Sequence, residues 1–162
     1  MSESTTQSAE RTTLVYDDDG LGRPPWAMSS PLLKEYYDTE WGLPIFEEAA
    51  LYERLSLESF QSGLSWAVVL KKREAFRAAF RNFDPDKVAE FDEADVERLL
   101  GDASIIRNET KIRAAINNAK ATIALREEGG LAEFIWAYQP PENLYPTVME
   151  DIPKKSYESK LM

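Results

Sequence analysis

Apolar residues recur along most of this chain at the three- and four-residue spacing of helices. No segment keeps the strict alternation of a half-buried strand, although residues 14–16 fit a short strand or a docking arm. The chain is therefore expected to be all-α, with short helices joined by tight turns. The pattern predicts helices over residues 30–37, 47–61, 65–80, 84–91, 92–100, 109–127 and 131–138.

Capping residues support several of these boundaries. Ser30 and Asp84 each precede a proline, which combines a capping side chain with the residue best suited to the first helical position. Asp92, with a second acid at Asp95, predicts another helix start. Gly63 is expected to end the second predicted helix, and the two glycines at 129 and 130 are expected to end the longest one.

Length and composition indicate one globular domain. The chain has 162 residues, 43% of them hydrophobic, which suits a sizeable core. Residues 1–20 are polar, so we expect a flexible N-terminal arm followed by a single all-α domain over residues 21–162. No run of about 18 apolar residues is present, which argues against a membrane span. The first residues do not resemble a secretory signal, and a cytoplasmic location is expected.

The sequence contains neither histidine nor cysteine. Ser-His-Asp and Cys-His nucleophile systems are therefore excluded. Ordinary zinc sites, which draw on these two residue types, are excluded as well. Acid–base chemistry must then fall to Asp, Glu, Lys or Tyr side chains.

The formal net charge of −10 argues against a generic nucleic-acid binder. Two segments differ from the rest, because residues 61–81 and 103–126 each carry five basic residues and one acidic residue. These segments could together form a surface that faces phosphates. The alternative is that they are solvated helix faces paired with the acidic segments.

One carboxylate stands out near the end of the second predicted helix. Leu51, Leu55 and Glu58 fall at helical spacing, so Glu58 is expected on a buried apolar face. A buried charge needs a partner or a purpose, because burying it alone is costly. Two interpretations stay open: a core glutamate paired with an arginine or a helix terminus, and a functional acid.

Several collinear motifs accompany Glu58, at residues 23–27, 35–44, 57–66, 69–74, 83–85, 105–108 and 111–112. Together they make the chain resemble the DNA-3-methyladenine glycosylase I family over roughly residues 20–138. The resemblance implies the all-α helix-hairpin-helix glycosylase fold. It also implies hydrolysis of the N-glycosidic bond of 3-methyladenine in double-stranded alkylated DNA, after the damaged nucleotide is flipped from the duplex.

The resemblance also assigns a base pocket. By matching position, Glu58 would be the catalytic and base-recognition carboxylate, and Tyr36 and Trp66 would stack on the base. Trp26 would form another pocket wall. The alternative for Tyr36 is a core tyrosine with an exposed hydroxyl. Trp41 is expected in the core, as is Phe76.

DNA contacts are implied by the residues that follow. Gly63 and Leu64 match the turn that approaches the gap left by the flipped base, where an apolar wedge would compensate for lost stacking. Gly63 could instead do no more than end a helix. Lys71, Lys72 and Arg73 become candidate phosphate contacts.

The chain also departs from the family pattern. The family's structural zinc is held by a Cys and a His at positions where this chain has Pro24 and Tyr37, and by two further ligands that would lie beyond Met162. No zinc or other cofactor is therefore expected. The family's final helices would also follow Met162, so we expect an incomplete C-terminal end, weaker duplex binding and self-association through the uncovered face.

Two alternatives to an active enzyme follow from these departures. The first is a non-catalytic relative that binds a purine base or a protein partner through the same pocket. The second is a chain that folds only as an oligomer.

Overall fold

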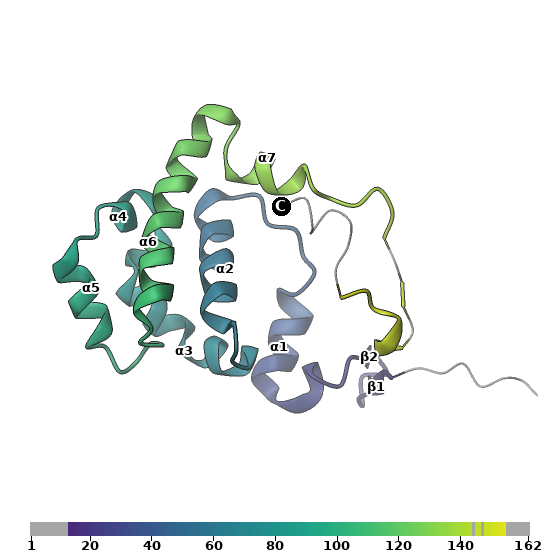
Figure 1. The fold of residues 1–162 in the computed structure, drawn as a ribbon. Helices are drawn as coiled ribbons and strands as arrows, with labels where there is room; N and C mark the ends of the chain where they lie inside the picture. Colours follow the sequence, from purple (N-terminus) through teal and green to yellow (C-terminus); the bar gives the residue numbers. More distant parts are fainter. Residues whose placement is uncertain (1–12, 144, 147, 155–162) are drawn as a thin grey trace, which may run out of the picture. The chain divides into compact units, whose positions relative to one another are not determined.

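A computed structural model describes residues 13–143, 145, 146 and 148–154. Helices account for most of these residues, and the one sheet among them has two short strands (Figure 1). The all-α prediction is confirmed. The elements are β1 (Val15–Tyr16), β2 (Gly22–Arg23), η1 (Ala27–Ser29), α1 (Pro31–Thr39), α2 (Glu48–Gln61), α3 (Trp66–Ala79), η2 (Arg81–Phe83), α4 (Pro85–Ala89), α5 (Glu93–Leu100), α6 (Glu109–Ala124), η3 (Leu125–Glu128), α7 (Leu131–Trp136) and η4 (Met149–Asp151).

The predicted caps are present. Ser30 Oγ accepts a hydrogen bond from Leu33 N at 3.2 Å at the start of α1. Asp92 and Asp95 exchange side-chain and backbone hydrogen bonds in a full capping box at the start of α5. Gly129, with φ 103°, ends the long helical segment in the left-handed conformation. Within that segment α6 ends at Ala124 and the chain continues as the 3₁₀ helix η3.

The chain divides into two compact units, which we describe separately. The first comprises residues 1–42 and 140–162, and the second comprises residues 43–139. The prediction of a single domain over residues 21–162 stays a prediction. Within the described residues, no helix is both long and apolar enough to cross a membrane.

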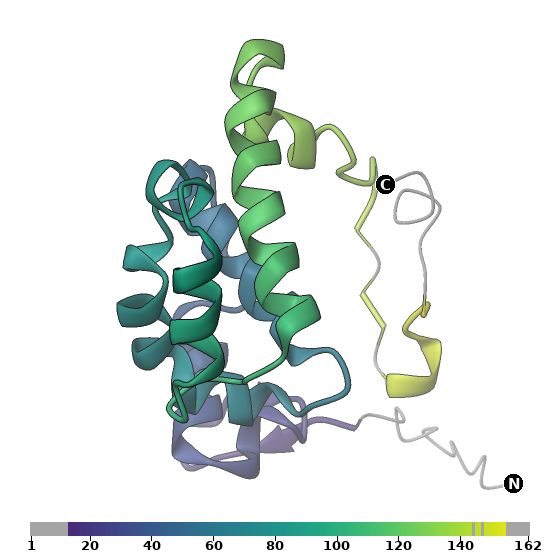
Figure 2. The same cartoon turned by 60° about the vertical axis from the view of Figure 1, so that its left-hand side comes forward.

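Four phenylalanines form the centre of the second unit. Phe60 of α2 packs against Phe76 of α3, with 4.7 Å between ring centroids, and Phe80 stacks on Phe83 at 5.4 Å. All four side chains are fully buried. Helix α6, the long green helix of Figures 1 and 2, packs against α2, α4 and α5 and completes this core. Tyr52 ties α2 to α6, because its hydroxyl donates to Ala115 O at 2.7 Å.

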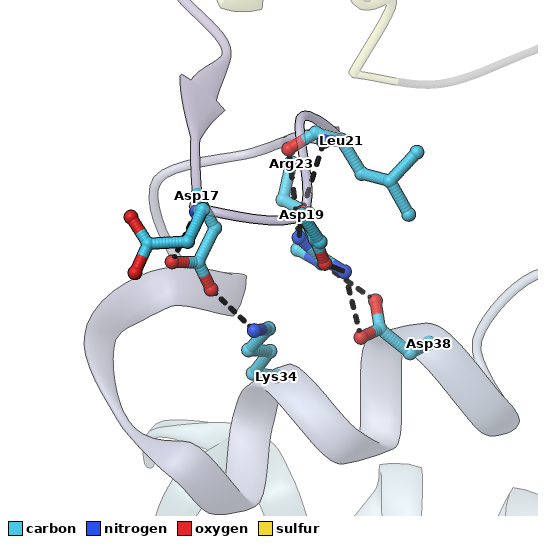
Figure 3. A network of polar contacts seen from close by, with 7 residues as sticks. Asp17, Asp19, Leu21, Arg23, Lys34 and Asp38 are labelled. Atoms are coloured by element: carbon cyan, nitrogen blue, oxygen red, sulfur yellow. Dashed lines mark hydrogen bonds and ion pairs between the residues drawn. The ribbon is translucent and has the colours of Figure 1, made fainter.

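The first unit is held by an arginine between two carboxylates (Figure 3). Arg23, on β2, is 3% exposed and bonds Asp38 of α1 through Nε at 2.7 Å. The same guanidinium bonds Asp19 through Nη2 at 2.7 Å and Nη1 at 3.1 Å. Lys34 of α1 forms an ion pair with Asp17 through its ammonium. These pairs fasten the β1–β2 hairpin to α1, the helix that carries Tyr36.

The hairpin corrects one expectation about the N-terminus. Residues 1–20 were expected to form a flexible arm, of which residues 1–12 lie outside the described residues. Val15–Tyr16 pairs antiparallel with Gly22–Arg23, which agrees with the short strand considered for residues 14–16 and shows that the arm does not extend to residue 20. Asp17 and Asp19, which follow this strand, form ion pairs with Lys34 and Arg23.

We predict that Asp19 makes the fold acid-sensitive. Its hydrogen bonds from Arg23, and from the backbone of Leu21, lower the pKa of Asp19 to about 2. A depressed folded-state pKa means that the carboxylate stabilises the fold above pH about 4, and that this contribution is lost as the pH falls toward 2. Asp19→Asn should therefore lower Tm at pH 7, and its Tm should fall less than that of the wild type between pH 5 and pH 2.

The matched control is Asp18→Asn, which changes the exposed neighbour by the same chemistry. Its Tm should follow the wild-type pH profile. Equal pH profiles for Asp19→Asn and Asp18→Asn would contradict the assigned role of the Arg23 pair.

Candidate functional site

Helix α2 presents Glu58 outward, which corrects the expectation of a buried acid. The buried side of α2 carries Tyr52, Ser56 and Phe60. Leu55 is 43% exposed, and Glu58 is exposed beside it on the opposite side of the helix. Of the three residues expected on one buried face, Leu51 is buried with 7% of its surface exposed, whereas Leu55 and Glu58, one and two turns later, point to solvent. A solvent-facing carboxylate carries no burial cost and is accessible to a ligand.

Trp66 begins α3, across the turn that follows α2. It is half-buried, and it packs against the hydrophobic core. The guanidinium of Arg54 lies over the Trp66 ring, with 6.0 Å between Cζ and the ring centroid. Arg54 precedes Glu58 by one helical turn on the same outward side of α2. The sequence patterns did not single out Arg54, because a contact between two helices leaves no periodic signal.

The segment between these helices is a type II β-turn over residues 61–64. Leu64 N donates to Gln61 O at 2.6 Å, which closes the turn. Ser62 has φ −48° and ψ 119°, and Gly63 has φ +80°, the values expected for the two central residues. The left-handed φ at this position favours glycine, and it fits both a glycine that only ends the helix and one that shapes the turn for DNA, so both interpretations stay open. Leu64 follows with 40% of its surface exposed.

The basic residues after Trp66 lie in different environments. Lys71 is exposed, and Lys72 Nζ donates to Ser104 O at 3.3 Å. Arg73 is half-buried. Their role as phosphate contacts stays a prediction.

Other arginines of the two basic segments form ion pairs with acidic side chains. Arg77 bonds Glu53, Arg113 bonds Glu93, and Arg126 bonds Glu48. These three arginines therefore follow the second interpretation of the basic segments, in which basic helix faces pair with acidic residues.

In the first unit, Tyr36 and Trp26 occupy different environments. Tyr36 is buried, with 4% of its surface exposed, and Trp26 is half-buried. Trp26 packs edge-on against Tyr37 at 5.5 Å and lies 5.9 Å from Trp41. Tyr37 and Trp41 stack at 5.2 Å. Trp41 was expected in the core, but 52% of it is exposed, so this expectation is wrong; Phe76 is fully buried as predicted.

The residues at the family's zinc positions do not fit a metal. Pro24 has no side-chain donor atom, and the Tyr37 ring is occupied by contacts with Trp26 and Trp41. Within the part of the chain that the structure describes, no three His, Cys, Asp or Glu side chains come together as a metal site.

The predicted site residues thus come from both compact units. Glu58, Gly63, Leu64 and Trp66 lie within one continuous helix–turn–helix segment of the second unit. Trp26 and Tyr36 belong to the first unit. A pocket shared by the two groups stays a prediction.

Comparisons with known proteins agree with the motifs. Residues 26–162 match the family model for methyladenine glycosylase. The chain is 43% identical over 142 residues to DNA-3-methyladenine glycosylase 1 of Escherichia coli (strain K12), covering 86% of this chain and 76% of that protein. A crystal structure of 3-methyladenine DNA glycosylase I has a TM-score of 0.80 and 41% identity, covering 85% of this chain and 77% of the other.

A further solved structure concerns ligand recognition. It describes how 3-methyladenine DNA glycosylase I from Staphylococcus aureus recognises 3-methyladenine. Its TM-score with this chain is 0.65 at 36% identity, covering 68% of this chain and 59% of that one.

We predict that replacing Gly63 destabilises the protein only through the backbone conformation that the turn requires at this residue. A Cβ at Gly63 would meet no atom within 4 Å, so Gly63→Ala adds only the strain of a positive φ. That strain should lower the free energy of unfolding by about 1–2 kcal/mol. Urea denaturation followed by tryptophan fluorescence measures this change.

Gly101→Ala is the matched control. Gly101 ends α5 with φ −84°, and its Cβ would make only ordinary contacts from 3.5 Å. This variant should be as stable as the wild type or slightly more so. If the two alanine variants proved equally stable, the left-handed conformation of Gly63 would be wrong.

Proposed function

The chain belongs to the methyladenine glycosylase family, and we propose that it hydrolyses the N-glycosidic bond of 3-methyladenine in alkylated DNA. The observation that carries the proposal is the arrangement of Glu58 and Trp66 on either side of the turn at residues 61–64. One is an exposed carboxylate, the other a partly exposed indole supported by the core. Together they match the requirements of a cationic, aromatic base.

This reaction requires little acid–base catalysis. Methylation at N3 leaves the adenine ring cationic, so the bond between N9 and C1′ is already weak. When it breaks, the electron pair goes to the base, which leaves as neutral 3-methyladenine. Water adds to the positive charge that develops at C1′ and releases a proton. The absence of histidine is therefore compatible with this reaction.

Glu58 would recognise the base and stabilise positive charge. Its carboxylate can accept hydrogen bonds from the exocyclic amine of the adenine edge. Because Glu58 faces solvent before binding, the base itself would exclude water and strengthen this electrostatic interaction. Trp66 would stack on the electron-poor ring, an interaction worth about 1–3 kcal/mol per base. Tyr36 and Trp26 would contribute further pocket surface.

DNA would be held by the turn and by nearby cations. Leu64, which is 40% exposed on the turn, suits an apolar wedge at the gap left by the flipped nucleotide. Lys71, Lys72 and Arg73 follow on α3 and would contact phosphates. Self-association stays a prediction, and light scattering would test it.

A second candidate function is binding of a purine base without cleavage. The negative charge of the chain and the ion pairs that engage Arg77, Arg113 and Arg126 favour it, because they reduce attraction to DNA. Retained binding of free 3-methyladenine, without base release from DNA, would identify this function.

The enzymatic proposal predicts release of 3-methyladenine from methylated duplex DNA at low salt. Trp66→Ala should abolish release, and Glu58→Gln should lower kcat/KM by about 100-fold, since it removes the negative charge that faces the base. Chromatography of the released base measures both. Glu97→Gln, the same change at an exposed glutamate of α5, is the control and should keep full activity. A well-folded wild type that releases no base would defeat the proposal.

We further infer that this chain acts without the family's structural zinc. The support is Pro24 and Tyr37 at the ligand positions and the lack of Cys and His. Because a structural zinc contributes folding free energy, removing one lowers stability. An excess of EDTA should here leave both Tm and the excision rate unchanged, and elemental analysis should find substoichiometric zinc. Stoichiometric zinc, or a lower Tm in EDTA, would contradict this inference.

A further inference from the structure

Lys111 occupies a helix position where its charge is unfavourable. Asn108 caps α6, and its Oδ1 accepts from Lys111 N at 3.0 Å, which places Lys111 in the first turn of the helix. The positive end of the helix dipole lies there, and cations are disfavoured. A lysine in that position needs a compensating interaction elsewhere.

That interaction is with the end of α2. Lys111 Nζ donates to Phe60 O at 3.0 Å and to Ser62 O at 2.7 Å. Carbonyls at the C-terminal end of a helix lack backbone partners, and the negative end of the helix dipole favours a cation. One ammonium therefore satisfies Phe60 O, in the last turn of α2, together with Ser62 O, in the turn that follows. The bond to Ser62 has the short length of a charge-assisted hydrogen bond.

The bond to Ser62 O also selects the conformation of the turn. Ser62 is the first central residue of the type II turn, and rotation of the peptide between Ser62 and Gly63 would convert it to type I. Gly63 tolerates both forms, because glycine accepts positive and negative φ. Rotation would turn Ser62 O away from Lys111 Nζ and break the bond. Gln61 Nε2, which donates to Leu64 O at 2.6 Å, closes the other end of the same turn.

We propose that Lys111 is a positioning residue that holds the turn at residues 61–64 in the type II form, and so places Leu64 for the duplex. This role rests on the proposed glycosylase function. Lys111 would act through the turn and make no contact with the base or with phosphate. Its ammonium is engaged with two carbonyls of the protein, unlike the side chain of an exposed phosphate-binding lysine.

The test compares Lys111→Met with Lys120→Met. Both remove one charge from α6 and keep an unbranched stem, but Lys120 is exposed. In Lys111→Met, the NMR cross-peak between Ser62 Hα and the Gly63 amide, which is strong in a type II turn and weak in a type I turn, should weaken severalfold, because the hydrogen bond that favours type II is lost. Single-turnover excision from duplex DNA should fall by about 10-fold. Lys120→Met should match the wild type in both measurements.

Three further readouts separate positioning from other roles. Binding of free 3-methyladenine, measured by tryptophan quenching, should be unchanged in Lys111→Met. The slope of log K against log salt for duplex binding should also be unchanged, whereas loss of a phosphate contact would reduce it by about 1. Lys111→Arg, which keeps a charged donor, should retain the strong Ser62–Gly63 cross-peak.

The outcomes are distinguishable. An unchanged Ser62–Gly63 cross-peak in Lys111→Met, or a weakened one with unchanged excision, overturns the positioning role while the wild-type enzyme remains active. A reduced salt slope also overturns it, in favour of a phosphate contact. A wild type that releases no base from duplex DNA overturns the proposed function and the positioning role with it.

Discussion

The site depends on reversal of the chain between α2 and α3 within a few residues. The carboxylate lies in the last turn of α2 and the indole is the first residue of α3, so the conformation of residues 61–65 sets the distance between them. A type II turn with a left-handed glycine achieves this reversal and leaves Phe60 O and Ser62 O to be satisfied from another helix. Lys111 of α6 supplies that partner, which couples the site to the core helix behind it.

Local sequence rules predicted the elements well. Caps and helix-ending glycines depend on residues close together in sequence, so Ser30, Asp92 and Gly129 could be assigned before the fold was known. Which face of each helix is buried was less predictable. Periodicity shows that Leu55 and Glu58 share a face, but only packing against α3 and α6 decides that the opposite face is buried.

Packing between distant parts of the chain also explains why the environments of Trp41 and Lys111 could not be predicted from local sequence. An aromatic residue with no obvious surface signal was expected in the core, yet Trp41 packs against Tyr37 while remaining half exposed. Lys111 was counted as one charge in a basic segment. Its partners, Phe60 and Ser62, are about fifty residues away in sequence, so no local pattern could show them. One clue was available from sequence, because a lysine in the first turn of a helix opposes the dipole.

Charge placement matters more for this protein than net charge. Ion pairs with Glu53, Glu93 and Glu48 engage Arg77, Arg113 and Arg126, so a phosphate would have to compete with a carboxylate for each of them. Long-range attraction to DNA is weak at −10, and affinity would have to come from close contacts at the turn and the start of α3. A residue that fixes the turn then acts on the very contacts that the overall charge does not supply. In a more basic protein, diffuse attraction could compensate for a poorly ordered turn. Because the negative net charge of this protein provides little such attraction, its binding to DNA depends on a well-ordered turn.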